Sequence, residues 1–520
     1  MKKTYIKIMC GALLTLGFTA CSTDLLDNSQ HGVLDQQTYY NTDQDAKEAT
    51  TAIYGEITAT TGFMNLETLR GLVNNLLADD SWPGEETHGG SSWAISEFTF
   101  DSNSDFINNY FVRLYNIIGK CNLVLDNVKG DTPVQQQMLA EARVLRAWMY
   151  MDLASLWGNP PIVDHMLDAS ETAQPNSEPG KAWEFIENDL VTAINSGALT
   201  QKSGVDDKNI YRVSKQFAQA LLGKAYLWSK NYTESAKAFD EVINSGLFKL
   251  WDGDYQEMLQ PKNKSNAEFL FESNYMEDAN NPGANMNLWP MFSNNLRANI
   301  WNQGANTCSL SYGFGMFAPR GSLYEAFVKE EGADGYRLNQ TMKTYKQMNE
   351  LGYKLQDGVR VPTEGYVMWK NRVTYDWVSQ SNIYGTLNNT HWMRYAEVLL
   401  CAAEANLQAG NQQKADKYLN EVRQRAKLPF KTATMDAIKL EKRLELCGEG
   451  VRYLDLLRWG DAATVLKDQG KTFPWMTPDG KVEWDSSNTQ YGFKEGRNER
   501  LPYPATEIVV NPNLKQNPGY

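Results

Sequence analysis

Apolar residues recur at intervals of three and four along much of the chain, and the clearest run covers residues 393–459. In 394–405, tyrosine, valine, leucine and alanine return at this interval between polar residues. The interval reappears in 415–426 and again in 441–459. Such a repeat places the apolar side chains on one face of a helix. The pattern therefore predicts amphipathic helices that pack against one another.

Charged residues interrupt the apolar face of this region at the spacing of one helical turn. They are Glu445, Glu449, Arg452, Asp455 and Arg458. A charge among apolar neighbours is tolerated when an opposite charge satisfies it. We therefore expect ion pairs that are partly buried between helices.

The first half of the chain carries the same helical period. It predicts one helix that begins after Thr42 as its N-cap. Further helices are expected over 106–128, 134–157, 183–196, 214–230 and 233–245.

Small and large residues within these helices match the spacing of a tetratricopeptide repeat. Gly223, Ser235 and Phe239 occupy such positions, and Ala415 and Leu419 belong to a looser second match. Any antiparallel helix pair can produce isolated matches of this kind. Several pairs in order, with short connections, favour a helical-repeat scaffold.

Three stretches interrupt the helical period and are rich in polar or loop-forming residues. They lie at about 55–104, 263–390 and 472–500. A β-strand is expected over 268–273, where apolar residues form a short run. We expect these stretches to be excursions from the scaffold, so that residues 21–520 form a single, mostly α domain with irregular loop and short-strand insertions.

The N-terminus has the pattern of a processing signal. A basic segment is followed by an apolar run over 8–18, and small residues precede Cys21. The run is too short to span a bilayer as a stable helix. We expect residues 1–20 to be a lipoprotein signal peptide and Cys21 to be lipidated, with ordinary secretion as the alternative. The acyl chains would then hold the protein on a membrane.

Composition and charge narrow the function classes. The chain is 42% hydrophobic and 22% charged, which is ordinary for a globular protein. Its net charge of −13 argues against nucleic acid as a partner, because phosphate binding requires a basic surface. The four histidines are scattered and no CxxC pair occurs, so neither a metal site nor a cofactor is expected.

The cysteines after Cys21 do not suggest a disulfide framework. Cys121, Cys401 and Cys447 lie among apolar residues of predicted helices. We expect buried free thiols at these three positions. Cys308 lies in a loop-like stretch and its state stays open.

Several motifs resemble those of the SusD/RagB family. They are RYAEVLL at 394–400, LNEVRQRA at 419–426, RLELCGEGVRYLDLLRWG at 443–460 and NPNLKQNPGY at 511–520. The resemblance covers nearly the whole chain after the signal. It implies a SusD-like fold and an outer-membrane lipoprotein that faces the cell exterior. It also implies capture of an oligosaccharide or polysaccharide for a SusC-like TonB-dependent transporter.

A glycan site needs aromatic rings in loops, beside short polar residues. Sugars stack their C–H faces on rings and exchange hydrogen bonds through their hydroxyls. Two stretches fit, one around Asp79–Trp82 and one around 287–312. From them we predict a platform of Trp82, Trp289, Trp301 and Tyr312, with Arg70, Asp80, Asn299 and Asn302 as polar contacts. The platform would need exposed, roughly coplanar rings.

Other tryptophans are expected in the core, because tryptophan is on average largely buried. Helical spacing assigns Trp148, Trp157, Trp183, Trp228 and Trp459 to it. Trp93, Trp369, Trp377 and Trp392 are also assigned there rather than to the site.

Two other functions remain open. A peptide-binding member of the same family would present a groove without an aromatic platform. A glycoside hydrolase would place two carboxylates across a cleft, about 5–10 Å apart. No GxSxG, HExxH, P-loop or dinucleotide motif is present, and we expect no catalytic residues.

Overall fold

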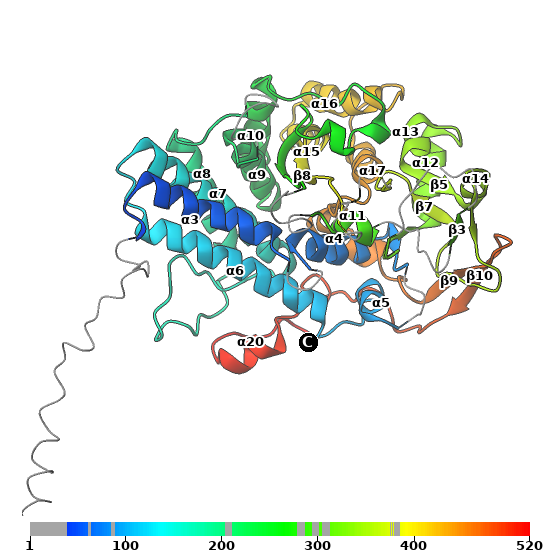
Figure 1. Cartoon of the computed structure of the whole chain (residues 1–520), viewed down its shortest axis with the longest axis horizontal. Helices are drawn as coiled ribbons and strands as arrows, with labels where there is room; N and C mark the ends of the chain where they lie inside the picture. Colours follow the sequence, from blue (N-terminus) through cyan, green and yellow to red (C-terminus); the bar gives the residue numbers. More distant parts are fainter. Residues whose placement is uncertain are drawn as a thin grey trace, which may run out of the picture.

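A computed structural model gives the fold of the chain. It describes residues 39–60, 64–84, 89–202, 211–277, 286–293, 301–303, 313–374, 376, 378 and 385–520. Long helices form one side of the molecule, and short strands and helices lie on the other side (Figure 1). The prediction of a mostly α fold with short-strand insertions is confirmed.

Long helices dominate the N-terminal half. They are α3 (Asp43–Thr58), α4 (Leu66–Leu76), α5 (Ser91–Ser96), α6 (Asp105–Asn127), α7 (Pro133–Leu156), α8 (Lys181–Asn195), α9 (Lys215–Trp228) and α10 (Tyr232–Asn244). The predicted N-cap of α3 is confirmed, since the Thr42 hydroxyl accepts from the Asp45 N–H at 3.1 Å. None of the described helices is long and apolar enough to cross a membrane.

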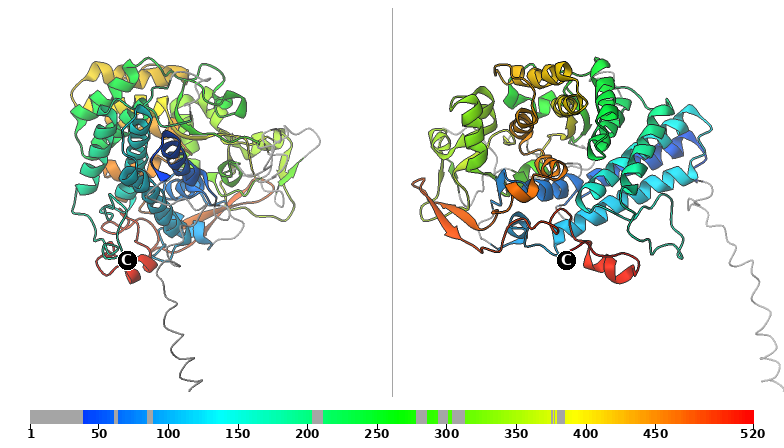
Figure 2. Two further views of the ribbon diagram at one scale, coloured as in Figure 1. Left: turned by 60° about the vertical axis from the view of Figure 1, so that its left-hand side comes forward. Right: turned by 180° about the vertical axis from the view of Figure 1, so that it is seen from behind.

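The C-terminal third returns to helices. They are α15 (Tyr395–Gln408), α16 (Gln412–Arg425), α17 (Met435–Leu446), α18 (Arg452–Trp459), α19 (Ala462–Val465) and α20 (Ala505–Val510). Helices α6 and α7, α9 and α10, and α15 and α16 pack in pairs. Helix α10 also packs on α15, which joins the two halves into one scaffold. Figure 2 shows this arrangement from two further directions.

The small and large positions of the repeat explain the close approach of α9 and α10. A Cβ on Gly223 would lie 2.8 Å from the ring of Phe239, so only glycine fits there. The Ser235 hydroxyl donates to the Gly223 carbonyl at 2.7 Å. The repeat-like spacing therefore has a packing cause.

Replacing Gly223 with alanine is expected to destabilise the protein by about 1–3 kcal/mol, because the added methyl overpacks the helix pair. Urea unfolding measures the change. Gly55 in α3 is the matched control, since nothing lies within 4 Å of its Cβ position. Gly55→Ala should stabilise by up to about 1 kcal/mol through helix propensity. Equal unfolding midpoints for the two variants would contradict this account.

The strands are short, and within the described chain they form five antiparallel pairs, namely β1–β4, β2–β8, β3–β6, β5–β7 and β9–β10. Their bounds are β1 (Ser81–Trp82), β2 (Phe269–Ser273), β3 (Trp301–Gln303), β4 (Ala318–Pro319), β5 (Met342–Thr344), β6 (Tyr353–Leu355), β7 (Tyr366–Met368), β8 (Thr390–Arg394), β9 (Thr472–Met476) and β10 (Val482–Ser486). The strand expected over 268–273 is confirmed as β2.

The interrupted stretches contain more helix than expected. Besides α4 and α5, the stretch 263–390 contains α11 (Trp289–Ser293), α12 (Gly321–Glu331), α13 (Tyr336–Thr341) and α14 (Tyr345–Glu350). Two short 3-10 helices, η2 (Tyr255–Glu257) and η3 (Pro261–Asn263), come just before it. The irregular assignment of 55–104 is wrong for α4. There the Asn65 side chain caps the helix by accepting from the Thr68 N–H at 2.8 Å.

The core assignments hold for the tryptophans of the longest helices. Trp148 and Trp157 are buried, whereas Trp183 and Trp228 are half-buried and stack with ring centroids 5.2 Å apart. Trp459 is also half-buried. Trp93, Trp369 and Trp392 are buried as expected, and Trp377 lies outside the described residues. Cys121, Cys401 and Cys447 are buried free thiols, as expected.

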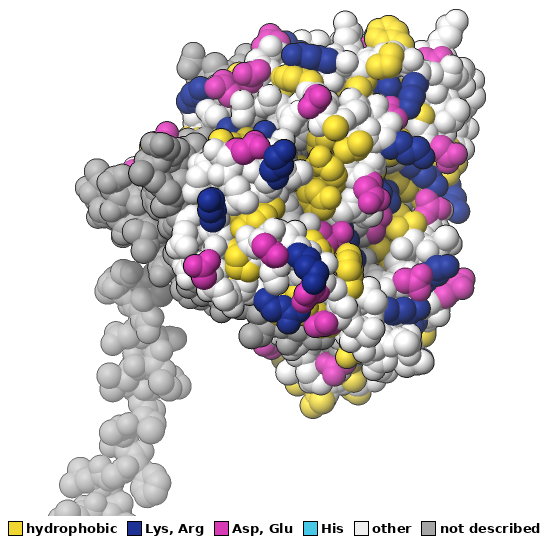
Figure 3. Space-filling model, turned by 90° about the vertical axis from the view of Figure 1, so that its right-hand side faces the viewer, with side chains coloured by type: hydrophobic (Ala, Val, Ile, Leu, Met, Phe, Trp, Pro, Cys, Tyr) yellow, Lys and Arg dark blue, Asp and Glu magenta, His cyan; other side chains and the backbone are white. Residues whose placement is uncertain are grey.

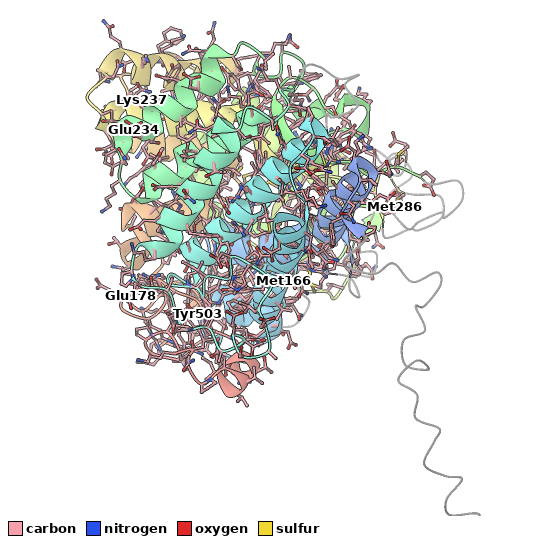
Figure 4. All side chains as sticks on the ribbon, turned by 90° about the vertical axis from the view of Figure 1, so that its left-hand side faces the viewer. Met166, Glu178, Glu234, Lys237, Met286 and Tyr503 are labelled. Carbon is pink, nitrogen blue, oxygen red and sulfur yellow. The ribbon has the colours of Figure 1, made fainter. Side chains whose placement is uncertain are left out.

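The outer face of the scaffold is solvated. In α10, Glu234 and Lys237 point outward (Figure 4) and form an exposed ion pair at 2.6 Å. The β9–β10 hairpin projects from the opposite edge of the molecule (Figures 1 and 2). The excursions thus lie beside the scaffold, and the pocket described next forms where the two meet.

Candidate functional site

A pocket that opens to solvent lies between α4, α11, β8 and the turn that follows α17, and about 800 Å³ of empty space, open solvent included, lies within and above it. Its walls include two tryptophans, Trp289 and the largely buried Trp392, with several asparagines and both acidic and basic side chains. These groups come from segments far apart in the sequence, from Glu67 to Glu449. The pocket is therefore a product of the complete fold.

Trp289 forms an aromatic wall of the pocket, and its neighbours fix the ring. The ring lies directly over Gly71 of α4, where a Cβ would come within 2.6 Å of it. Its edge meets Phe317 with centroids 5.1 Å apart and planes at 73°. The backbone N–H of Trp289 donates to the side-chain oxygen of Asn287 at 2.9 Å, at the residue where α11 begins. The indole is thus held in place before any ligand arrives.

Side-chain amides form a second wall. The Asn287 amide donates to the Asn388 carbonyl at 3.1 Å, and the Asn388 amide donates to the Leu259 carbonyl at 2.9 Å. The Asn388 side-chain oxygen is buried and has no hydrogen-bond partner among the described residues. Asn389 donates to Glu272 at 3.2 Å. A buried oxygen without a donor favours a ligand that carries hydroxyl groups.

Glu67 lines the pocket as a buried carboxyl group. Burial raises its pKa to about 8, although hydrogen bonds from Thr390 and Asn287 act in the opposite direction. At neutral pH the side chain is therefore mainly protonated. The floor of the pocket carries no negative charge at this position.

Three charged side chains that line the pocket, Arg70, Lys370 and Glu449, are already in ion pairs. Arg70 donates to Asp152 at 3.1 Å, and Lys370 donates to Glu449 and to the Glu445 carbonyl. Burial alone would raise the pKa of Glu449, but Arg394 and Lys370 lower it to about 2. Both Glu449 oxygens accept from Arg394, at 2.7 and 2.8 Å. Both oxygens of Glu449 are therefore engaged in ion pairs within the protein.

A buried ion-pair network lies next to the pocket and includes its lining residues Lys370 and Glu449. Arg394 contacts Glu268 at 2.8 Å and Glu445 at 2.6 Å, and Arg337 contacts Glu445 at 2.9 Å. Arg425 also reaches Glu445. All five charged residues form ion pairs. Glu445, Asp455 and Arg458 pair between helices, with Lys442 as the partner of Asp455 and Glu404 as the partner of Arg458. The expectation is wrong for the other two, since Glu449 lies in the turn after α17 and Arg452 pairs with Asp79 in the loop after α4.

Two of the eight predicted ligand residues lie on the pocket, Arg70 and Trp289. Trp82 and Trp301 are only 4% and 5% exposed, so the expectation of an exposed platform is wrong for both. Trp82 packs in a small aromatic cluster and donates to Glu364 at 2.7 Å. Trp301 packs against Tyr345 in a second cluster.

The remaining predicted residues lie elsewhere. Asp80 is buried and accepts from Arg443 at 2.7 Å, so its role here is structural. Asn302 is exposed on β3 and does not line the pocket. Asn299 and Tyr312 lie outside the described residues, as do Cys21 and Cys308.

Sequence reasoning missed the polar segment that opens β8. Asn388, Asn389, Thr390 and His391 all line the pocket. The available signal was a run of four polar residues at 388–391, two residues before the helical motif at 394–400. Among the residues that the structure describes, no group of His, Cys, Asp and Glu side chains could hold a metal ion.

Comparison with known proteins identifies the class of protein to which this fold belongs, that of SusD-like glycan-binding proteins. Residues 296–520 match the SusD family, and residues 27–227 match a family described as "Starch-binding associating with outer membrane". The chain belongs to the SusD/RagB family, whose similarity covers it from end to end. This is a family of glycan-binding proteins and not of enzymes.

Relatives match along their full length. The "SusD-like protein P2" of Formosa agariphila is 25% identical and is covered over 100% of both chains. A SusD-like protein of Bacteroides ovatus is 24% identical over 100% of this chain and 98% of its own. A solved "Laminarin binding SusD-like protein" is 27% identical with a TM-score of 0.77, over 92% of this chain and 99% of its own.

Proposed function

We propose that this protein is a cell-surface lipoprotein that captures an oligosaccharide or polysaccharide and delivers it to a SusC-like TonB-dependent transporter. The observation that carries the proposal is the full-length similarity to a solved laminarin-binding protein of the same fold. A further relative of this fold, surface glycan-binding protein A from Bacteroides thetaiotaomicron, is solved in complex with laminarihexaose. The matched family description also names association with the outer membrane.

The pocket supports a sugar ligand by its chemistry. Trp289 offers a fixed indole for the C–H face of a sugar ring, and the amides of the second wall offer donors and acceptors for hydroxyls. The ion pairs of Arg70, Lys370 and Glu449 within the protein leave these charges without need of a charged ligand. We propose Arg70 and Trp289, together with Asn388 and Asn389, as ligand contacts.

Anchoring is part of the same proposal. Cleavage before Cys21 and acylation of its thiol would tether the chain to the outer membrane, facing the exterior, while residues 21–520 act as one domain. A lipid anchor leaves the folded domain free to approach a transporter that is already embedded in the membrane.

Calorimetric titration of the protein lacking residues 1–21 tests the proposal, with laminarin, starch and other plant, host and microbial polysaccharides as probes. Binding of at least one glycan is expected. Trp289→Ala should weaken it by about 10-fold or more, since truncating a central aromatic contact commonly costs above 1 kcal/mol. Gly71→Ala should weaken it similarly, because the new methyl displaces the same indole.

Phe430 supplies the matched control, because it is 70% exposed and lies outside the pocket. Phe430→Ala should leave affinity and thermal unfolding unchanged. Binding that survives both Trp289→Ala and Gly71→Ala would place the glycan elsewhere on the protein. If no polysaccharide binds and members of a peptide library do, the proposed glycan function is wrong and the protein captures peptides.

A further inference from the structure

The pocket beside Trp289 is recessed into the molecule. None of the residues that line it is exposed, since each of them is either buried or half-buried. The buried members, such as Glu67 and Thr390, lie deepest, and half-buried members such as Trp289 and His391 lie nearer to solvent. A ligand must therefore enter the pocket rather than lie across a flat surface.

Contacts between neighbouring segments close the sides of the pocket. The Gly450 N–H donates to the Asn75 side chain at 3.1 Å, which joins α4 to the turn after α17. Lys370 pairs with Glu449 and so joins the same turn to the segment that follows β7. On the other side, the ring of Trp289 lies directly over α4 and joins α11 to it.

The deep end of the pocket is closed as well. The Thr390 hydroxyl of β8 donates to Glu67 of α4. The Asn287 amide donates to the Thr390 hydroxyl at 3.4 Å and to the Asn388 carbonyl at 3.1 Å. These bonds tie together the segments that carry the deepest lining residues, so a sugar chain cannot pass between them. The pocket therefore has one entrance.

The room inside the pocket matches one sugar unit. The space that the centres of water molecules can occupy there is about 100 Å³. At about 10–15 Å³ per water centre, this is room for about seven to ten water molecules. A hexose unit displaces about six water molecules and a disaccharide about twelve, at about 30 Å³ per molecule of liquid water. One unit therefore fits, and two do not.

The described residues offer no flat alternative to the pocket. Two of their aromatic side chains are exposed, Phe430 in the loop between α16 and α17 and Trp484 on β10. Helix α16 and strand β10 lie at different edges of the molecule (Figures 1 and 2), so these two rings do not form one platform. Figure 3 views the end of the molecule where β10 lies, and the hydrophobic side chains there form small patches among acidic and basic ones. A row of exposed rings, which would bind the interior of a chain, is absent from the described part of the protein.

We propose that the pocket binds the terminal sugar unit of a glycan chain or branch, rather than a unit inside the chain. An interior unit carries a linkage on two sides, so both of its neighbours would have to leave through the same entrance. A terminal unit carries one linkage and can enter a recessed site that holds a single unit. The inference rests on the proposed function and adds to it the part of the glycan that is recognised.

Binding is then expected to follow the number of chain ends and not the mass of the glycan. Each cut inside a chain creates two new ends. Endo-acting glycoside hydrolysis is therefore the class of reaction that would supply ligand to this pocket.

Calorimetric titration tests the inference with laminarin and soluble starch, each used whole and after partial cleavage by an endo-acting hydrolase. The number of protein molecules bound per gram of glycan should rise in proportion to the number of ends, while the Kd per end stays within about twofold. Trp289→Ala should weaken binding of whole and cleaved glycan alike, by about 10-fold or more. Phe430→Ala should leave both the capacity and the Kd unchanged.

The outcomes separate this inference from the function on which it rests. If wild type binds a glycan and its capacity per gram does not rise with the number of ends, terminal recognition is overturned and the proposed function stands. Terminal recognition by the pocket is also overturned if end-dependent binding survives Trp289→Ala. If wild type binds neither laminarin nor starch, whole or cleaved, the proposed function fails for these glycans and the inference fails with it.

Discussion

Glu445→Gln is expected to destabilise the folded protein by about 3–5 kcal/mol, because it leaves buried arginines without their shared partner. Glu445 is fully buried and contacts Arg337 at 2.9 Å, Arg394 at 2.6 Å and Arg425. Glutamine has nearly the same shape, so loss of charge is the main change. Urea unfolding at neutral pH measures the effect as a lower midpoint.

The exposed pair Glu234–Lys237 provides the control for this prediction. Its nitrogen–oxygen distance of 2.6 Å is as short as those in the network, but both side chains are in solvent. Glu234→Gln should cost less than about 1 kcal/mol, as surface ion pairs do. Similar costs for the two substitutions would mean that the network contributes no more than a surface pair.

Glu67→Gln is expected to stabilise the protein at alkaline pH and to leave it almost unchanged at pH 5. The folded state raises the pKa of Glu67 from 4.5 to about 8, so it binds the proton more tightly than the unfolded chain does. The free energy that Glu67 contributes to folding is therefore fully present below about pH 4.5, and it is lost as the pH rises to about 8. The loss is on the order of 3–5 kcal/mol at 1.36 kcal/mol per pH unit.

Glutamine keeps a side-chain oxygen that can accept from Thr390 and has no proton to lose. Urea unfolding of wild type and variant at pH 5 and pH 8.5 isolates Glu67, since all other titrating groups cancel in the difference between the two proteins. Glu241→Gln, an exposed change on α10, should alter stability equally little at both pH values. A difference between Glu67→Gln and wild type that does not change with pH would contradict the prediction.

Sequence periodicity predicted the scaffold because its helices are long and their contacts are mostly between neighbours in the chain. The bounds of the five helices predicted over 106–245 agree with the structure within two residues, whereas α4 and α5 were not predicted. Charged positions such as Glu445 and Arg458 were predicted as ion pairs, because a charge on an apolar helical face needs a partner. The identity of the partners was not predictable, since Arg394 and Glu268 are 126 positions apart.

The candidate site was only partly predictable for the same physical reason. Trp82 and Trp289 lie in similar surroundings in the sequence, beside short polar residues. Their different fates depend on distant segments, since Glu364 binds the indole of Trp82 whereas Gly71 leaves room for the ring of Trp289. The four polar residues that open β8 carry no periodic signal. Spatial convergence of this kind is visible only in the fold.

The residues that line the pocket come from α4, α11, β8 and the turn after α17. The pocket is therefore complete only when the whole chain is folded. A ligand that touches all these segments binds only the complete native state, so it must raise the melting temperature of the whole chain rather than protect one part of it. The gain grows with the logarithm of ligand concentration and reaches about 2.7 kcal/mol at one hundred times Kd. Thermal-shift screening of unlabelled glycan libraries can therefore find the cargo before its identity is guessed.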